Sequence, residues 1–247
     1  MRRPAALAAA ADLYRQRAAT ASARGSADPS DIKAIDVQYS SHMGLGHVLL
    51  ALEDSEGARQ AYDTALAMAG RLQQLDDARR ERRLRDRAIA MYASATIDWS
   101  DTPPAARRRL DEAVGIMRAI MRLDPSNIRR PRDLATMLAL RGKIRVSKQT
   151  EVDGGIEDYQ ESIEHFTNRA VESPRETSSQ QDFESTILEM NSVLTAAARA
   201  ADAYRITDVA VTQVHCIAEA ESRAGRKQWI EILARINNAR QHAPSER

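Results

Sequence analysis

The sequence has few of the residues on which several protein classes depend. A single cysteine, Cys216, occurs in 247 residues, which excludes a disulfide framework and a zinc site built from cysteines. Aromatic residues make up 4% of the chain, whereas strands are enriched in aromatic and β-branched residues. No run of about 18 apolar residues occurs, so no transmembrane helix is predicted. The composition favours a soluble protein built from helices.

Charge is balanced overall but unevenly placed along the chain. The net charge of +1 excludes a polybasic nucleic-acid-binding protein on gross composition. Residues 71–145 nevertheless carry 18 basic and 10 acidic side chains, and residues 146–247 carry 11 and 17. Nearly all the basic residues are arginine. A GC-rich genome would explain that choice, as would recruitment of arginine for bidentate ion pairs.

Two sequence markers recur with a period near 48 residues. The first marker is a small residue, an aromatic or leucine four positions later, and a helix-stopping step that follows, often Asp-Pro or Ser-Pro. It starts at Ala10, Ala58, Ala106 and Gly155. The second marker is an aspartate within a short segment of mainly apolar or basic residues, and it occurs at Asp36, Asp86, Asp133 and Asp182. Together these markers indicate an internal repeat.

Each repeat is predicted to be a pair of helices. Apolar residues after Tyr62 follow a three-then-four spacing that forms one helical stripe. Proline steps stop these helices, because the residue before proline is disfavoured in the α region. Pro103-Pro104 and the stretch 151–155 are predicted to mark turns within pairs.

The residues of the best repeat resemble the tetratricopeptide pattern. Leu45-Gly46, Leu49, Ala58, Tyr62 and Ala65 fall at that family's spacings. The period is longer than the family's 34 residues or so, because the second helix continues past Gly70. The longer repeat is similar to the helical repeats found behind bacterial serine/threonine kinase domains. The resemblance implies an all-α, right-handed solenoid of helix-turn-helix repeats.

The predicted organisation is one helical-repeat domain over residues 1–247. The repeats are expected at residues 4–28, 32–77, 79–125, 129–174 and 177–222, with a capping helix at 224–241. Within segment 196–222 a helix break is expected near Ala201-Asp202. In the last helix, Trp229, Ile230, Leu233 and Ile236 are expected to form the buried stripe. The first repeat lacks a first helix, so either a lone helix caps the array or the chain begins inside a longer polypeptide.

The resemblance also implies a binding groove, since the family's concave wall is lined by the first helix of each pair. Carried over onto this sequence, the groove positions are Ser40, Met43, His47 and Leu50, then Ala88, Met91, Ala95 and Trp99, then Thr136, Ala139 and Lys143. These side chains are mixed and mainly small, and the alternative is that they are ordinary surface or core. They lack the repeated lysine and asparagine that clamp a carboxylate in chaperone adaptors.

The densest basic run is residues 78–87. Arg82 and Arg83 are its candidates for contact with a phosphate or an acidic partner. The competing interpretation is a solvated helix start with pairs such as Arg82–Asp86 at i,i+4. Nucleic-acid binding would favour aromatics interleaved with the arginines, and few are near.

The sequence nominates no catalytic, metal or cofactor site. His42 and His47 are five residues apart and do not share a helix face, so they are not expected to hold a metal. Cys216 is interpreted as a small apolar residue in a helix interface rather than a nucleophile. Carboxylates at 157, 158, 161 and 164 are interpreted as a solvated acidic face. Glycine-rich phosphate loops and kinase signatures are missing.

The predicted function is therefore a non-catalytic scaffold or regulatory module that binds a protein or peptide, without a cofactor and without a membrane. The first residues imitate a signal peptide, but Asp12, Arg15 and Arg17 interrupt the apolar run, so a cytoplasmic protein is expected. The resemblance implies that the chain is the C-terminal part of a larger bacterial signalling protein. The alternative is an arginine-rich face that binds nucleic acid or another polyanion.

Overall fold

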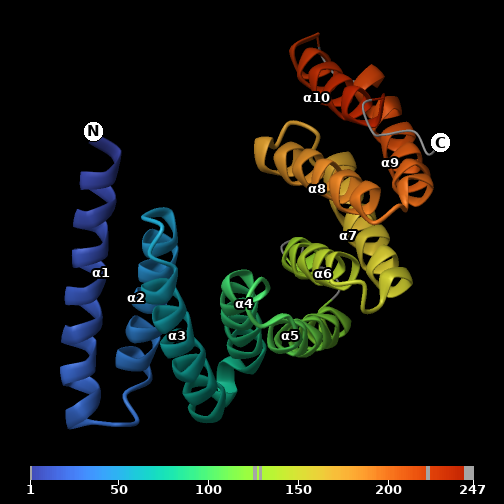
Figure 1. Ribbon diagram of the computed structural model, residues 1–247. Helices are drawn as coiled ribbons and strands as arrows, with labels where there is room; N and C mark the ends of the chain where they lie inside the picture. The colour runs from blue at the N-terminus through green and yellow to red at the C-terminus, as the bar shows by residue number, and fades with distance from the viewer. Residues whose placement is uncertain (1, 125–126, 128–129, 221–222, 242–247) are drawn as a thin grey trace. The chain divides into compact units, whose positions relative to one another are not determined.

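The computed structural model describes residues 2–124, 127, 130–220 and 223–241. Helices occupy most of these residues, and no strand occurs among them, so the prediction of an all-α chain is confirmed. The chain divides into two compact units, residues 1–125 and 126–247, which we name unit 1 and unit 2. Each unit is a set of neighbouring helices arranged as a helical repeat (Figure 1).

Over residues 2–124, unit 1 contains five α-helices, each packed against the next along the chain. They are α1 (Arg2–Ala27), α2 (Ile32–Ala51), α3 (Ser55–Leu75), α4 (Arg80–Asp98) and α5 (Pro103–Leu123), with a short 3-10 turn at Asp77–Arg79 before α4. The helix α3 runs on past Gly70 to Leu75, as the long repeat predicts.

Unit 2 contains α6 (Arg130–Ser147), α7 (Val152–Glu172), α8 (Thr177–Ala196), α9 (Ala200–Ala220) and α10 (Arg223–Gln241). The helix α7 packs against α6, α8 and α9, and α8 packs against α9 and α10. The first helices of the pairs therefore begin at Ile32, Arg80, Arg130 and Thr177, in steps close to the period of the sequence markers.

Local sequence explains where these helices begin and end. The Asp31 and Asp54 carboxylates accept hydrogen bonds from the backbone N–H groups of Ala34 and Gly57, each 2.9 Å long. They thereby satisfy donors that the first turn of a helix leaves open. Proline begins α5, where its missing N–H costs nothing.

Three of the four turns within helix pairs contain a residue with positive φ. These residues are Glu53, Gln149 and Ala198, with φ of 65°, 52° and 57°. The left-handed conformation lets backbone N–H groups after the helix return to its last carbonyls, as the bond from Arg199 N to Leu194 O shows. None of the three is glycine, so these turns carry little signal in the sequence.

Two predicted turns lie elsewhere. Gly154 and Gly155 belong to α7 rather than to the turn before it. Gly155 is used for close packing, because its carbonyl oxygen lies 2.8 Å from where a Cβ on Gly142 would stand. The break expected at Ala201-Asp202 falls earlier, and α9 begins at Ala200. The Arg199 guanidinium pairs with Asp202 at 2.7 Å and closes the first turn of α9.

The last helix is rotated from the predicted orientation. Trp229, Leu233 and Ile236 are buried as expected, but Ile230 is 55% exposed and Ile232 takes its place in the core. The observed series 229, 232, 233 and 236 has the three-and-four spacing of one helical face. Ile230 follows Trp229 directly and is turned about 100° away from it around the helix, so it falls outside that face.

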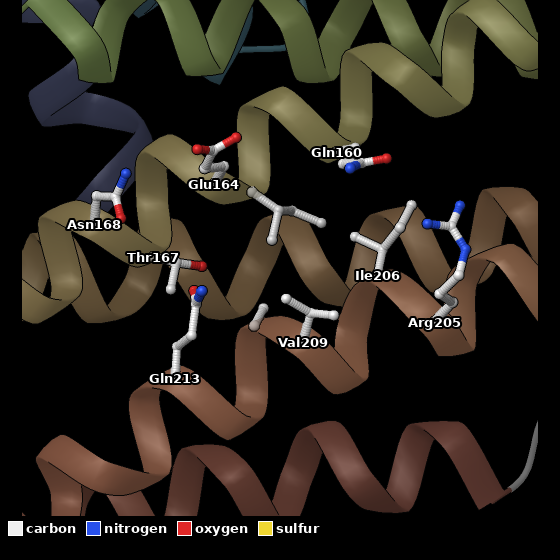
Figure 2. A pocket seen from close by; sticks show the side chains of 10 residues that line it. Gln160, Glu164, Thr167, Asn168, Arg205, Ile206, Val209 and Gln213 are labelled. Atoms are coloured by element: carbon white, nitrogen blue, oxygen red, sulfur yellow. The ribbon is translucent and has the colours of Figure 1, made fainter.

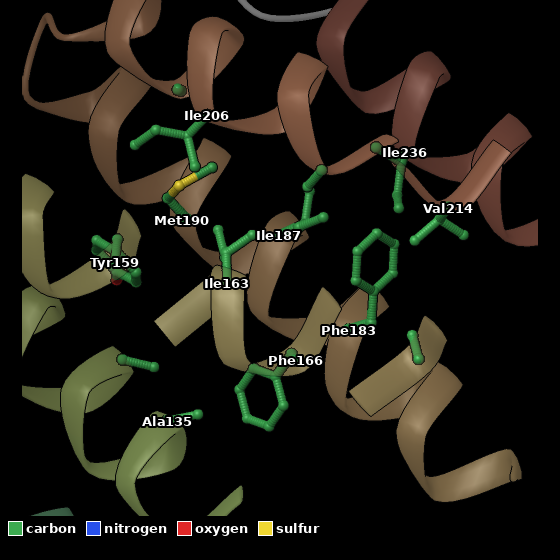
Figure 3. Packing of buried hydrophobic residues seen from close by; sticks show 14 of the residues in the cluster. Ala135, Tyr159, Ile163, Phe166, Phe183, Ile187, Met190, Ile206, Val214 and Ile236 are labelled. Atoms are coloured by element: carbon green, nitrogen blue, oxygen red, sulfur yellow. The ribbon is translucent and has the colours of Figure 1, made fainter. Parts of the chain in front are cut away.

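The cores of the two units differ in the size of their side chains. Around α2 and α3 the core is mainly alanine and leucine with Tyr62. In unit 2 the core contains Tyr159, Phe166 and Phe183 (Figure 3), together with Trp229. The rings of Phe183 and Trp229 meet edge to face with centroids 5.9 Å apart, a favourable geometry for aromatic pairs.

Candidate functional grooves

Each unit has a groove along the second helix of a pair. In unit 1 the α3–α4 groove has a volume of about 490 Å³. It is lined by Asp63, Leu66, Ala67, Gly70, Gln73 and Gln74 from α3 and by Arg87 and Met91 from α4. The side-chain positions on α3 follow helical spacing, so a single face of α3 forms one wall.

In unit 2 the α7–α9 groove has a volume of about 170 Å³. It is lined by Gln160, Ile163, Glu164, Thr167 and Asn168 from α7 and by Arg205, Ile206, Val209, Ala210 and Gln213 from α9. Figure 2 shows Ile206 and Val209 on the wall from α9, with Arg205 at one end of the groove and Gln213 at the other. Apolar side chains thus line its middle and polar ones its rim.

The two grooves use equivalent positions of the repeat. Asp63, Leu66, Ala67 and Gly70 of α3 correspond to Gln160, Ile163, Glu164 and Thr167 of α7, since the marker that starts at Ala58 in one repeat starts at Gly155 two repeats later. The same face of a second helix therefore forms a groove in both units. Sequence reasoning missed this face, although the repeat register alone places these residues in equivalent positions.

Arg87 forms the wall of the α3–α4 groove. Its guanidinium donates to Gln73 Oε1 on α3 at 3.0 Å and pairs with Glu112 on α5. One side chain thus links three helices beside the groove. At the other end, Asp63 accepts from the Ser94 hydroxyl at 3.0 Å. The groove is bounded by side chains that are already held in place.

The residues predicted from the first helices are mostly engaged within the chain. Met43, Ala88, Met91, Ala95 and Ala139 are buried, Ser40, Trp99, Thr136 and Lys143 are half-buried, and His47 and Leu50 are exposed. Only Met91 lines either of the two grooves. Small residues at these positions are used for helix packing, which the family pattern does not distinguish from a binding wall.

His47 is tied to the core by Tyr62. The Tyr62 hydroxyl and His47 Nδ1 are 2.7 Å apart. Partial desolvation of the imidazole lowers the pKa of His47, although the residue as a whole is exposed, and burial raises the pKa of Tyr62 to about 12. The neutral imidazole can therefore accept the tyrosine hydrogen bond. Lys143 is held in unit 2 by Glu189 at 2.8 Å.

The two arginines proposed from the basic run have different environments. Arg83 is fully buried and pairs with Asp36, Asp76 and Asp86. It is a structural residue of unit 1, and its charge is neutralised from three sides. Arg82 is exposed, and it lies 3.4 Å from Asp36 and 3.8 Å from Asp86. The Arg82–Asp86 pair of the solvated-helix interpretation is confirmed.

Ion pairs one repeat apart join the first helices. In unit 2, Arg132 of α6 and Arg235 of α10 each bind a carboxylate of α8 in bidentate fashion, Asp182 and Glu184 respectively. In unit 1, α4 contacts Asp36 of α2 through two arginines, Arg82 and Arg83, each of which pairs with one oxygen of the carboxylate. Arginine therefore serves in bidentate pairs, for which its planar fork is suited.

Two interpretations of single residues are wrong. Asp158 is not part of a solvated face: it is buried and accepts from Arg141 at 2.6 and 2.9 Å and from Arg145 at 2.9 Å. Burial raises the pKa of Asp158, and both guanidinium groups oppose that shift. Cys216 is exposed rather than buried in a helix interface, because the buried face of α9 passes through Val214 instead.

In the part of the chain that the structure describes, no group of three or more histidine, cysteine or acidic side chains is arranged to hold a metal ion. Over the same residues, no helix has both the length and the apolar character needed to cross a membrane.

Comparisons with known proteins add little to this geometry. No family model and no curated protein matches the chain. Among solved structures, the chain is similar to the crystal structure of BtubC (BKLC) from P. vanneervenii, with a TM-score of 0.47 and 14% sequence identity over 98% of this chain and 95% of that chain. Likeness at this level carries no argument about function.

Proposed function

We propose that this chain is a non-catalytic helical-repeat module that binds a protein partner. The observation that carries the proposal is the recurrence of a groove on the same face of α3 and α7. Repeat proteins that bind other proteins commonly present equivalent surfaces in successive repeats. A face that is open in both units, while the first helices are joined by ion pairs, is suited to such a role.

The packing of α2 on α3 supports a tetratricopeptide-like arrangement of the repeat as part of this proposal. A Cβ on Gly46 would stand 2.4 Å from the ring of Tyr62, so glycine is needed for the ring to lie against α2. Ala58 and Ala65 are fully buried beside it. These residues occupy the small and aromatic positions of the tetratricopeptide family. We propose on this basis that the repeats form a right-handed solenoid, and that the chain belongs to a cytoplasmic bacterial signalling protein.

The alternative, polyanion binding by the arginine-rich segment, has less support. Arg83, Arg87 and Arg109 each pair with carboxylates of unit 1, which reduces the positive charge available to phosphates. A duplex DNA titration at rising salt tests this alternative, since phosphate contacts weaken steeply with salt through counterion release. Measurable, salt-sensitive affinity would favour it over protein binding.

Site-specific photo-crosslinking tests the proposed function. A crosslinking amino acid replaces Gln74 in the α3–α4 groove or Asn168 in the α7–α9 groove, in full-length protein in cells of the source organism. Thr20 on α1 and Ser192 on α8 are matched controls, because both are exposed and neither lines a groove. We expect a discrete crosslinked protein from the groove positions and none from the controls. The same products at all four positions, or none at any, would contradict the proposal.

A further inference from the structure

The α7–α9 groove has the size of one aromatic side chain. Its volume is about 170 Å³, and an apolar protein cavity of about 150 Å³ accommodates benzene. Ile163 and Ile206 are buried at its base, while Val209 is 57% exposed on its wall. An exposed valine facing a buried isoleucine pair offers apolar surface that a ring entering from solvent would cover.

One polar atom at this groove has no partner. Thr167 is 1% exposed, and its hydroxyl oxygen makes no hydrogen bond to the described part of the chain. A buried hydroxyl left in that state costs free energy. Figure 2 shows the long side chain of Gln213 reaching from α9 toward Thr167 on α7. Gln213 is exposed, and exposed side chains change rotamer within nanoseconds, so its movement would open a path to the hydroxyl.

The rim of the groove carries a negative charge that no described basic side chain neutralises. Glu164 is exposed and forms no ion pair with any residue that the structure describes, whereas Arg205 pairs with Asp202 at 3.4 Å. Glu157, about two turns before Glu164 on α7, is also exposed. The rim on α7 is therefore complementary to a basic group, and the amides of Gln160, Asn168 and Gln213 can pair with an extended peptide backbone.

We propose that the α7–α9 groove binds a tyrosine side chain of an extended peptide segment, with a lysine or arginine next to that tyrosine. The ring covers Ile163, Ile206 and Val209, the phenol hydroxyl pairs with the hydroxyl of Thr167, and the basic neighbour pairs with Glu164. This inference rests on the proposed function and names the chemistry of its partner. A phenol is selected over a plain ring because the groove offers apolar walls and one buried polar atom without a partner.

Synthetic peptides test the inference on the full chain. The probe is the blocked hexapeptide Ser-Gly-Lys-Tyr-Gly-Ser, and its affinity is measured by heteronuclear NMR titration at low salt. A phenylalanine analogue removes the phenol, and a glutamate analogue reverses the charge of the lysine. We expect the phenylalanine peptide to bind roughly five-fold more weakly, as the loss of one hydrogen bond implies. The glutamate peptide should bind more weakly still at low salt.

Matched variants locate the binding. Val209→Arg places a charge on the groove wall, and Thr212→Arg places the same charge at an exposed position of α9 that does not line the groove. We expect at least a ten-fold loss of affinity for Val209→Arg and less than two-fold for Thr212→Arg. Thr167→Val should abolish the preference for tyrosine over phenylalanine while unfolding at the same urea concentration or higher, because it removes an unpaired buried hydroxyl.

Three results would overturn the inference: no binding of the tyrosine peptide, equal binding of the tyrosine and phenylalanine peptides, or equal losses for Val209→Arg and Thr212→Arg. If the peptide fails while the crosslink from Asn168 remains, the groove binds another chemistry and the proposed function stands. If both fail, the proposed function fails as well.

Discussion

The most deeply buried charged residue is an arginine in unit 1 and an aspartate in unit 2. In unit 1 a single arginine, Arg83, is enclosed by the carboxylates of Asp36, Asp76 and Asp86. In unit 2 a single carboxylate, Asp158, is enclosed by Arg141 and Arg145. Arg83 connects α2, the end of α3 and α4, so it joins one helix pair to the next. Asp158 joins α6 to α7 and therefore acts within one pair.

This difference indicates which contacts hold each unit together. A residue that joins successive pairs supports the stacking of repeats, whereas one that acts within a pair supports a hairpin. In unit 2 exposed ion pairs and large side chains join successive pairs, since Trp229 of α10 packs on Phe183 of α8 and its indole N–H donates to the Pro174 carbonyl at 3.0 Å. Variants in each unit can test this division of roles.

The largest expected effect is the loss of the buried guanidinium of unit 1. Arg83→Met leaves three carboxylates without their shared partner, and breaking a buried pair in this way costs about 3–5 kcal/mol. Arg82→Met is the control, because its exposed pairs are worth about 0–1 kcal/mol. The free energy of unfolding in urea, followed by Trp99 fluorescence in a Trp229→Phe background, reports on unit 1, since the only other tryptophan lies in unit 2. Equal losses for the two variants would show that burial of Arg83 does not support stacking.

The second-largest expected effect is the loss of stability when a methyl group is added where the two helices of a pair approach closely. A Cβ on Gly142 would lie 2.8 Å from the backbone carbonyl oxygen of Gly155, whereas a Cβ on Gly46 would meet the ring of Tyr62. Overpacking of this kind costs about 1–3 kcal/mol. We expect Gly142→Ala to destabilise unit 2 more than Gly46→Ala destabilises unit 1, because a helix backbone moves less readily than a ring.

Urea unfolding followed by Trp229 for the first variant and by Trp99 for the second measures this difference. The reverse order would mean that the α6–α7 pair yields more readily than the Tyr62 ring does.

A smaller effect of opposite sign is expected at Gly115. This residue lies within α5, and a Cβ there would meet nothing within 4 Å. Gly115→Ala should stabilise unit 1 by roughly 0.5–1 kcal/mol, since glycine in a helix interior is unfavourable by that amount relative to alanine. A shift of the urea midpoint upward at constant slope is the expected readout. A downward shift would show that this side of α5 is covered in solution.

The sequence predicts the helices of this fold better than it predicts the surfaces. Asp-Pro steps, Pro103 and the apolar stripe after Tyr62 carry local signals, because they act through the backbone or through one helix face. The turns at Gln149 and Ala198 carry none, since any residue can be forced into the left-handed region by its neighbours. The prediction of a turn at Gly154 and Gly155 is wrong, because glycine occurs both in turns and where two helices approach closely.

The candidate site was predicted less well for a related reason. Small residues such as Ala88 and Ala95 fit a binding wall and a packed interface equally, and only the tertiary structure shows that they are buried. Arg83 and Arg82 are adjacent in sequence, yet one is buried and one is exposed. The grooves arise from pairs of helices, α3 with α4 and α7 with α9, so no single segment identifies them.

The smallest expected effect is a dependence of the stability of unit 1 on pH. Burial lowers the pKa of His42 and of His47 below the ordinary value. In the window between the folded pKa and that ordinary value, the unfolded chain binds more protons than the folded one, so stability falls as the pH falls through it. The His47 contribution has a visible cause, because protonation removes the acceptor of the Tyr62 hydrogen bond at 2.7 Å.

The measurement is the free energy of unfolding of unit 1 at pH 7.5 and at pH 5.5, compared with the His42→Gln and His47→Gln variants. In each variant the free energy of unfolding should change less between the two pH values than it does in the parent. The carboxyl of Asp86, whose pKa is raised by burial, works in the opposite direction, because its folded form gains a proton first as the pH falls. The difference between parent and variant cancels that contribution and isolates the histidine. If the variants follow the parent at both pH values, the imidazoles do not take part in holding α2 against α3.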